Sequence, residues 1–224
     1  MDPVEVYRTS RRRLTELAPE LSAEQLARPL PATPPWTVSD AYRHLAGVCA
    51  DVLDGTMEGA GSPAWTAAQI ESRRGASLVN VCAEWSERAP ALEAQVEAAG
   101  PAMSFTAFDA WTHEQDIRAA VGHGGARDAV ADGLATLALT TLARRYEGTG
   151  APTIEIQLPD RTATLGAGEP SVTLRTTPYD LLRVIFGRRS RAQMEALDWS
   201  NAADASAVME ALPIFPTPER DIID

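Results

Sequence analysis

Apolar positions recur with a helical period through the first two thirds of the chain, which indicates a series of amphipathic helices. Thr37 or Ser39 can cap the second of these helices, and Gly55 can end it. This layout is typical of an antiparallel helical bundle with one or two long loops. We expect helices at about 3–18, 38–55, 74–98, 104–122 and 128–147, with a proline-rich loop at 28–36 and a loop that contains Gly59, Gly61 and Pro63.

The pattern changes after the segment GTGAP at residues 148–152. Residues 153–159 alternate between apolar and polar side chains, as a half-buried strand does. The segments RTATLGAG and SVTLRTT indicate two further strands. Thr177 and Pro178 are suited to begin a helix. Two shorter helices, at about 190–197 and 202–211, and an irregular tail complete the expected elements.

These two patterns predict an α+β protein with two domains. Residues 1–147 are expected to form the helical bundle, and residues 148–224 a small α+β domain. A length of 224 residues suits this division. The chain is 45% hydrophobic and 23% charged, the mixture of an ordinary globular protein, so global disorder is not expected.

The chain is acidic, with a formal net charge of -11 and a pI of about 4.8. Nucleic acid and anionic membrane surfaces repel an acidic protein, so neither is expected as a partner. The basic runs RRR (11–13) and GRRSR (187–191) are local, and we expect them on solvated faces or at helix ends.

The sequence predicts a cytoplasmic location. It shows no signal peptide, and no apolar run approaches the roughly 18 residues that a membrane helix needs. Cys49 and Cys82 form no CxxC pattern, and a disulfide is not expected in a reducing compartment. Both cysteines are interpreted as buried thiols.

The segment FDAWTHEQDIRAAVG, residues 108–122, places Asp109 and His113 four residues apart. Residues at this spacing lie one above the other on the same helical face. Glu114 and Arg118 are expected on another side of the helix, where they can pair in solvent. An inward-facing polar pair is costly unless it is satisfied, which indicates either a bound group or a less buried helix.

One hypothesis is a metal site that adds a histidine from another helix. His44, in AYRHLAGV, flanks an apolar stripe and is the natural choice, whereas His123 lies among glycines and is expected to be exposed. Two histidines and a carboxylate leave one coordination position open, which is typical of catalytic sites. The donor types leave zinc, nickel, iron and manganese open. Asp116, one turn on, is suited to orient a ligand histidine.

The alternative interpretation involves no metal. Asp109 would then fix a protonated His113, and His44 would be a satisfied histidine at the edge of the core. Trp36 and Trp111 would be ordinary core or rim aromatics. The i, i+4 spacing is common by chance, so spacing alone does not decide between the two interpretations.

Three segments together resemble the mycothiol-dependent maleylpyruvate isomerase family of actinobacteria. They are PPWTVSDAYRHLAG (34–47), FDAWTHEQDIRAAVG (108–122) and LLRVIFGRRSRAQMEALDW (181–199), in the matching order. The resemblance covers nearly the whole chain. It implies an N-terminal DinB-like antiparallel four-helix bundle and a C-terminal domain similar to sterol carrier proteins.

The resemblance also implies site residues. In the family, zinc is held by a histidine of the HLAG segment and by an E-x-x-x-H pair, which here corresponds to His44, Asp109 and His113. This chain departs from the pattern by having aspartate where the family usually has glutamate. The family uses basic residues near its substrate, so Arg220 is a candidate catalytic residue and Arg118 a candidate cofactor-binding residue, although no motif assigns them.

The function implied is that of a metal-dependent enzyme that uses mycothiol. The thiol would bind as a thiolate at the open metal position and add to an electrophilic small molecule, as a cis-trans isomerase or a mycothiol S-transferase. Two alternatives stay open: a non-catalytic or regulatory binding protein with a degenerate metal site, and a metal-dependent hydrolase. The expected partners are small molecules, and the chain is expected to be a monomer or a homodimer.

Overall fold

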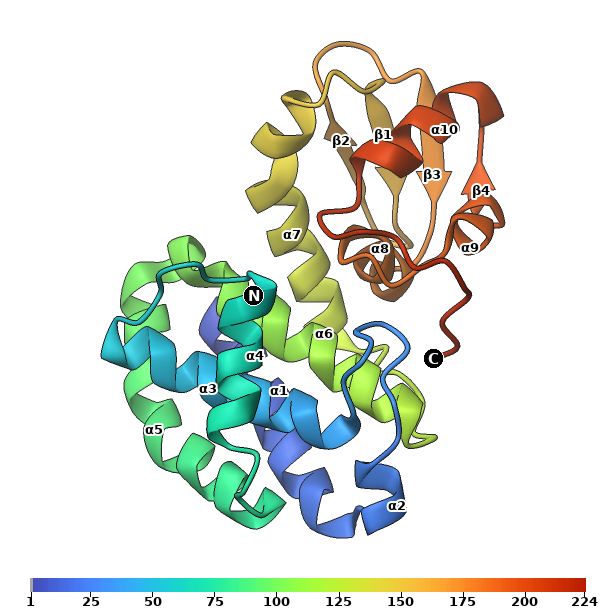
Figure 1. Cartoon of the computed structure of the whole chain (residues 1–224). Coiled ribbons are helices and arrows are strands. Elements are labelled where there is room, and N and C mark those ends of the chain that lie inside the picture. The colour runs from blue at the N-terminus through green and yellow to red at the C-terminus, as the bar shows by residue number, and fades with distance from the viewer. Residues whose placement is uncertain (1) are drawn as a thin grey trace. The chain divides into compact units, whose positions relative to one another are not determined.

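The computed structural model describes residues 2–224, which form two compact units, at 2–125 and 126–223 (Figure 1). The first unit is helical, and the second combines helices with a small sheet, as the sequence predicts. The first contains α1 (Pro3–Leu17), η1 (Ala18–Glu20), α2 (Ala23–Leu26), α3 (Val38–Asp54), α4 (Pro63–Ser72), α5 (Leu78–Ala99), η2 (Gly100–Met103) and α6 (Ser104–Ala120). The second contains α7 (Ala129–Glu147), β1 (Ile154–Gln157), β2 (Thr162–Leu165), β3 (Val172–Arg175), α8 (Pro178–Ile185), α9 (Arg191–Glu195), β4 (Asp198–Trp199) and α10 (Ala202–Ala211).

Helices α1, α3, α5 and α6 form the predicted four-helix bundle. Each of α1 and α3 packs against both α5 and α6, so the four helices enclose one core. Leu14, Leu92 and Ile117 are fully buried there. Trp85 is also fully buried and donates its indole N–H to the Tyr7 hydroxyl over 2.7 Å. The bundle therefore has an apolar interior in which a buried polar group needs a partner.

Local sequence signals fix where α3 begins and ends. Thr37 is its N-cap and forms a capping box with Asp40, in which each side chain accepts from the other residue's backbone N–H. Gly55 ends the helix with φ of 74°, a left-handed conformation that glycine adopts without steric cost. These signals set the position of His44 along the helix.

The helix α4 is a departure from the sequence analysis, which expects a loop around Pro63. Ser62 caps this helix and Pro63 occupies its first turn, but only Gln69 and Ile70 are buried along it. A helix that buries one narrow strip lacks the apolar period on which the prediction depends. Helix α5 also differs from the prediction, because it begins at Leu78, after its N-cap Ser77, and not near residue 74.

Glu114 is the clearest correction on α6. The sequence analysis expects it in solvent beside Arg118, but its side chain is 0% exposed and lies 3.6 Å from the guanidinium of Arg13 on α1. Arg118 instead donates to the Gly124 carbonyl over 3.0 Å. Because α6 packs against both α1 and α3, more than one of its faces is buried, which a single amphipathic stripe does not predict.

The second unit is built on a four-stranded sheet in the order β2-β1-β3-β4. The central strands β1 and β3 are parallel, and the outer strands β2 and β4 are antiparallel to their neighbours. The three longer strands correspond to the predicted ones, whereas β4 was not expected. Ile154, Ile156 and Leu174 point into the core of this unit with no exposed surface.

Helix α7 belongs to the second unit, where it packs against α8 and β2. Its Asp132 accepts a hydrogen bond of 2.6 Å from Arg161, just before β2. The units therefore divide at residues 125 and 126, before the boundary at 147 and 148 that the sequence analysis places after this helix. A helical period shows that a helix buries one side, but it does not show which core the helix joins.

The GRRSR run differs from its expected solvated face. Arg188 and Arg189 are buried, and Ser190 caps α9 as the expected helix-end role requires. Arg189 donates to Asp180 over 3.0 Å. Across the part of the chain that the structure describes, no helix combines the length and apolarity needed to cross a bilayer.

The buried pair between α1 and α6 yields a stability prediction. We expect Glu114→Ala to lower the free energy of unfolding by about 3 kcal/mol, because it leaves the partly buried charge of Arg13 without this carboxylate. Chemical denaturation measures the change. Glu97→Ala, an exposed position on α5, serves as the control and should change stability by less than about 0.5 kcal/mol. Equal effects for the two variants would contradict the importance of the pair.

Candidate metal centre

Three of the predicted site residues meet between α3 and α6. His44 lies on α3, and Asp109 and His113 lie one turn apart on α6. The Oδ1 atom of Asp109 is 3.3 Å from Nε2 of His44 and 3.6 Å from Nε2 of His113. One donor atom of each side chain lies within 4.8 Å of the others. The helix packing thus brings together residues that are 65 positions apart in the chain.

The three residues fit a divalent metal ion. Zinc binds imidazole nitrogen and carboxylate oxygen at about 2.0–2.2 Å, so neighbouring donors of a tetrahedral site are roughly 3.4 Å apart. The two distances to Asp109 Oδ1 match that spacing. Both histidines are buried, whereas the side chain of Asp109 is 27% exposed. A simple Asp109–His113 pair does not explain why His44 points at the same oxygen.

The other ring nitrogen of each histidine also faces a polar side chain. His44 Nδ1 lies 2.7 Å from Oε1 of Gln69, a residue of α4. His113 Nδ1 lies 3.4 Å from Oδ2 of the buried Asp116, too far for a short hydrogen bond but close enough for electrostatic attraction. Asp116 therefore lies where an orienting partner of His113 is expected.

Two tryptophans line the histidine rings. The Trp36 ring stacks against His113 at 5.6 Å between centroids and also contacts His44 at 4.8 Å. Trp65 of α4 meets His44 edge-on at 6.3 Å. Trp36 is therefore part of the site and not a remote core aromatic. Trp111, also on α6, has no exposed surface.

The remaining predicted residues belong to other segments of the chain. Arg220 is exposed in the second unit, and His123 is exposed in the loop after α6. Arg118 is half-buried at the end of α6, where it donates to the Gly124 carbonyl. The sequence analysis did not identify Gln69 or Trp65, because it assigned their helix to a loop.

Neither cysteine is activated as a nucleophile. Burial raises the pKa of the Cys49 thiol, and it raises that of Cys82 to about 11. At neutral pH a thiol with a pKa near 11 is ionised in only about one molecule in ten thousand. Both cysteines are free, as expected. Burial therefore keeps both cysteines mainly in the protonated thiol form at neutral pH.

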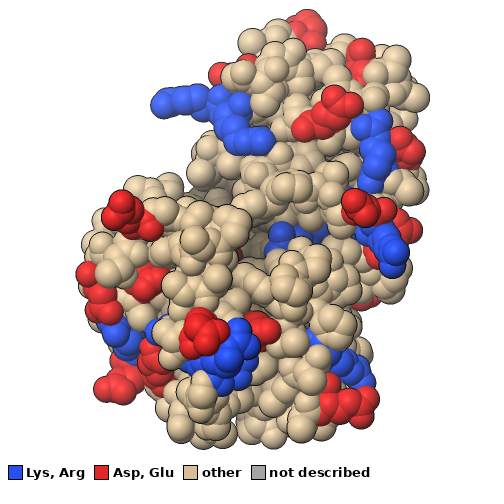
Figure 2. Space-filling model, viewed as in Figure 1, with Lys and Arg blue, Asp and Glu red and all other residues tan. Residues whose placement is uncertain are grey.

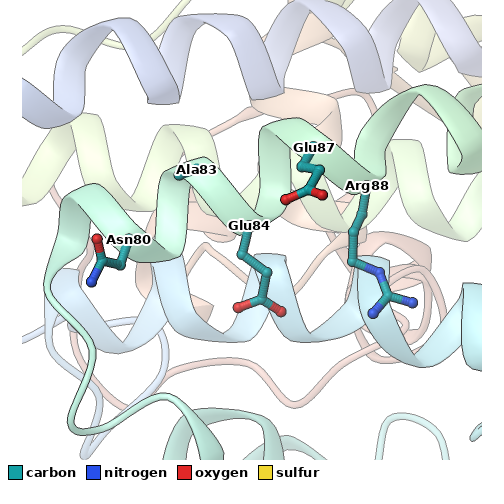
Figure 3. A pocket seen from close by; sticks show the side chains of 5 residues that line it. All are labelled: Asn80, Ala83, Glu84, Glu87 and Arg88. Atoms are coloured by element: carbon teal, nitrogen blue, oxygen red, sulfur yellow. The ribbon is translucent and has the colours of Figure 1, made fainter.

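A separate hollow lies on the outer face of α5 and contains none of these groups (Figure 3). It has a volume of about 540 Å³ and is wide open to solvent. Glu84 and Arg88 line it, but they form ion pairs with Arg73 and Asp54.

On the face drawn in Figure 2, acidic and basic side chains are interspersed over the surface, without an extended basic stripe that would suit nucleic acid.

Comparisons with known proteins agree with this architecture. Two crystal structures of mycothiol-dependent maleylpyruvate isomerase share the fold, each over 88% of this chain and 91% of the other. A histidine-to-alanine variant of that enzyme aligns with a TM-score of 0.60 at 10% sequence identity, and a second structure of the enzyme with 0.55 at 8%. No curated protein sequence matches the chain significantly.

Residues 7–131, which include α3 and α6 with their three converging donors, match the family profile described as the mycothiol maleylpyruvate isomerase N-terminal domain. Because this match covers more than half of the sequence, the chain belongs to the mycothiol maleylpyruvate isomerase family.

Proposed function

We propose that the protein is a metal-dependent enzyme that uses mycothiol to isomerise an electrophilic alkene, or to transfer the thiol to an electrophile. The observation that carries the proposal is the convergence of His44, Asp109 and His113 on one point. The ligands proposed from the sequence are these three residues, and zinc is the proposed metal. Family membership and the fold shared with mycothiol-dependent maleylpyruvate isomerases support the choice of thiol and reaction.

A bound divalent cation would favour the deprotonated form of a thiol, and a thiolate that adds reversibly to an activated double bond allows rotation about the carbon–carbon bond. The side chains of the protein itself would hold the cation and shield the site from water. His44, Asp109 and His113 would hold the cation and leave one position open. The Trp36 ring covers both imidazoles and would limit the access of water to them.

The aspartate at position 109 is compatible with this proposal. Although its side chain is one methylene shorter than the usual glutamate, its Oδ1 lies within 3.6 Å of both imidazoles. These distances support direct ligation by Asp109 and favour an intact metal site over a degenerate one. Asp116 and Arg118 are proposed as residues that support the cofactors, and Arg220 as a catalytic candidate from the family resemblance alone.

The proposed ligands lead to a prediction for metal content. We expect the purified protein to bind about one equivalent of zinc, and His44→Ala or His113→Ala each to weaken binding by more than about 100-fold, because even changes outside the ligand set cost roughly 10–100-fold. Competition with a chromophoric chelator measures the affinity. His123→Ala, which changes an exposed histidine, is the matched control and should bind zinc like the parent protein. Loss of zinc in that control would show that the ligand set is wrong.

The reaction class leads to a second prediction. The zinc-loaded protein should isomerise maleylpyruvate, or a related electrophilic alkene, only when mycothiol is added, and NMR of the mixture should detect the change of geometry. An isomerase leaves the free thiol concentration unchanged, whereas an S-transferase consumes one thiol for each product formed. Hydrolysis of an electrophile at the same rate without thiol would instead support the hydrolase alternative.

The protein's own thiols lead to a third prediction. Because burial raises the pKa of both cysteines, the double variant Cys49→Ala/Cys82→Ala should keep mycothiol-dependent turnover within about twofold of the parent. Alkylation of the native protein by iodoacetamide at pH 7 should be slow compared with that of free cysteine. Abolished turnover in a folded double variant would identify a cysteine as the nucleophile and overturn the role of an external thiol.

A further inference from the structure

A chain of hydrogen bonds leads from His44 away from the candidate metal centre. His44 Nδ1 lies 2.7 Å from Oε1 of Gln69, and Gln69 Nε2 donates to Oδ2 of Asp51 over 2.6 Å. The hydroxyl of Thr56 donates to the other carboxylate oxygen of Asp51 over 2.9 Å. Gln69 is 3% exposed, so both ends of its carboxamide depend on these protein partners.

The donor and acceptor directions in this series of hydrogen bonds decide which nitrogen of His44 carries a proton. A carboxylate accepts but does not donate hydrogen bonds, so the amide nitrogen of Gln69 must face Asp51 and its oxygen must face His44. Nδ1 of His44 must then be the donor. In a neutral imidazole this leaves the lone pair on Nε2, the atom that points at Asp109.

Gly47 makes room for this contact. It lies one turn after His44 on α3, and a β-carbon at this position would be 2.5 Å from Cβ and 2.7 Å from Cγ of Gln69. Both distances are shorter than carbon atoms can approach. Glycine inside a helix lowers its stability relative to alanine, so the residue needs a packing reason. The close approach of α4, and of Gln69 in particular, supplies that reason.

We propose that Gln69 and Gly47 are positioning residues that act through His44. Gln69 fixes the protonation and the ring orientation that present Nε2 to the metal, and Gly47 allows α4 to bring Gln69 within hydrogen-bond distance. This inference rests on the proposed metal-dependent function and assigns a role to two residues outside the ligand set. It also gives a physical reason for the HLAG segment: His44 would bind the metal, and Gly47 leaves room for Gln69, the hydrogen-bond partner of His44.

Zinc affinity tests the role of Gln69. Gln69→Leu should weaken zinc binding by about 10–100-fold, the usual effect of removing a partner of a metal-bound histidine. Gln95→Leu changes an exposed glutamine on α5 and should leave the affinity unchanged. The double variant Gln69→Glu/Asp51→Asn keeps the net charge, the acceptor for Nδ1 and the bond to residue 51, so it should restore most of the affinity.

A second pair of variants tests Gly47. Gly47→Ala should weaken zinc binding to a similar extent, because the added methyl group displaces Gln69. Gly75→Ala is the matched control, since a β-carbon there meets no atom within 4 Å and its affinity should not change. Thermal unfolding of the metal-free variants shows whether each is folded. A Gly47→Ala protein that is more stable and binds zinc normally would overturn the role of Gly47.

The outcomes separate this inference from the function on which it rests. If the parent protein binds zinc tightly and folded Gln69→Leu binds it equally well, the positioning role is wrong and the metal-dependent function survives. A parent protein that binds no stoichiometric zinc overturns both proposals. Weaker binding in Gln69→Leu without restoration in Gln69→Glu/Asp51→Asn would show that Gln69 acts through packing and not through its hydrogen bond, and would also overturn the inference.

Discussion

The candidate metal centre depends on how three electron-pair donors are accommodated where α3 meets α6. His44, Asp109 and His113 converge on one point, with Asp109 Oδ1 closest to both rings. Lone pairs that face one another in a largely buried position repel unless a cation, either a proton or a metal, lies between them. The stacked ring of Trp36 reduces contact with water further. The three-residue arrangement therefore supports a bound cation more strongly than an i, i+4 pair on one helix would.

The surroundings of the site are also polar, and several buried polar groups there face a polar partner. Gln69 faces His44, and Asp116 faces His113. Directly after His113 in the chain, the buried Glu114 faces Arg13 of α1. Helix α6 therefore carries polar contacts toward both of its neighbours in the bundle. Such networks stabilise one arrangement of the helices only when they are complete, which links the stability of the bundle to the geometry of the site.

The fold by itself leaves the reaction open. The structural alignments to the two crystal structures, with TM-scores of 0.60 and 0.55 at 10% and 8% sequence identity, establish a shared architecture alone, and one architecture supports many chemistries. The proposal of a thiol enzyme rests instead on the donors of the site and on the family to which the chain belongs.

The sequence by itself determined the features that depend on neighbouring residues. Capping residues and periodicity located α3, α6 and α7, alternation located three of the four strands, and i, i+4 spacing singled out Asp109 and His113. Tertiary structure decided what depends on distant residues. It placed α7 in the second unit and buried Glu114 against α1. It also brought Gln69 of α4 within hydrogen-bond distance of His44, in the space that Gly47 leaves by having no side chain. The reason is physical, because helix and strand preferences act over a few residues, whereas the choice of packing partner depends on contacts that no local pattern encodes.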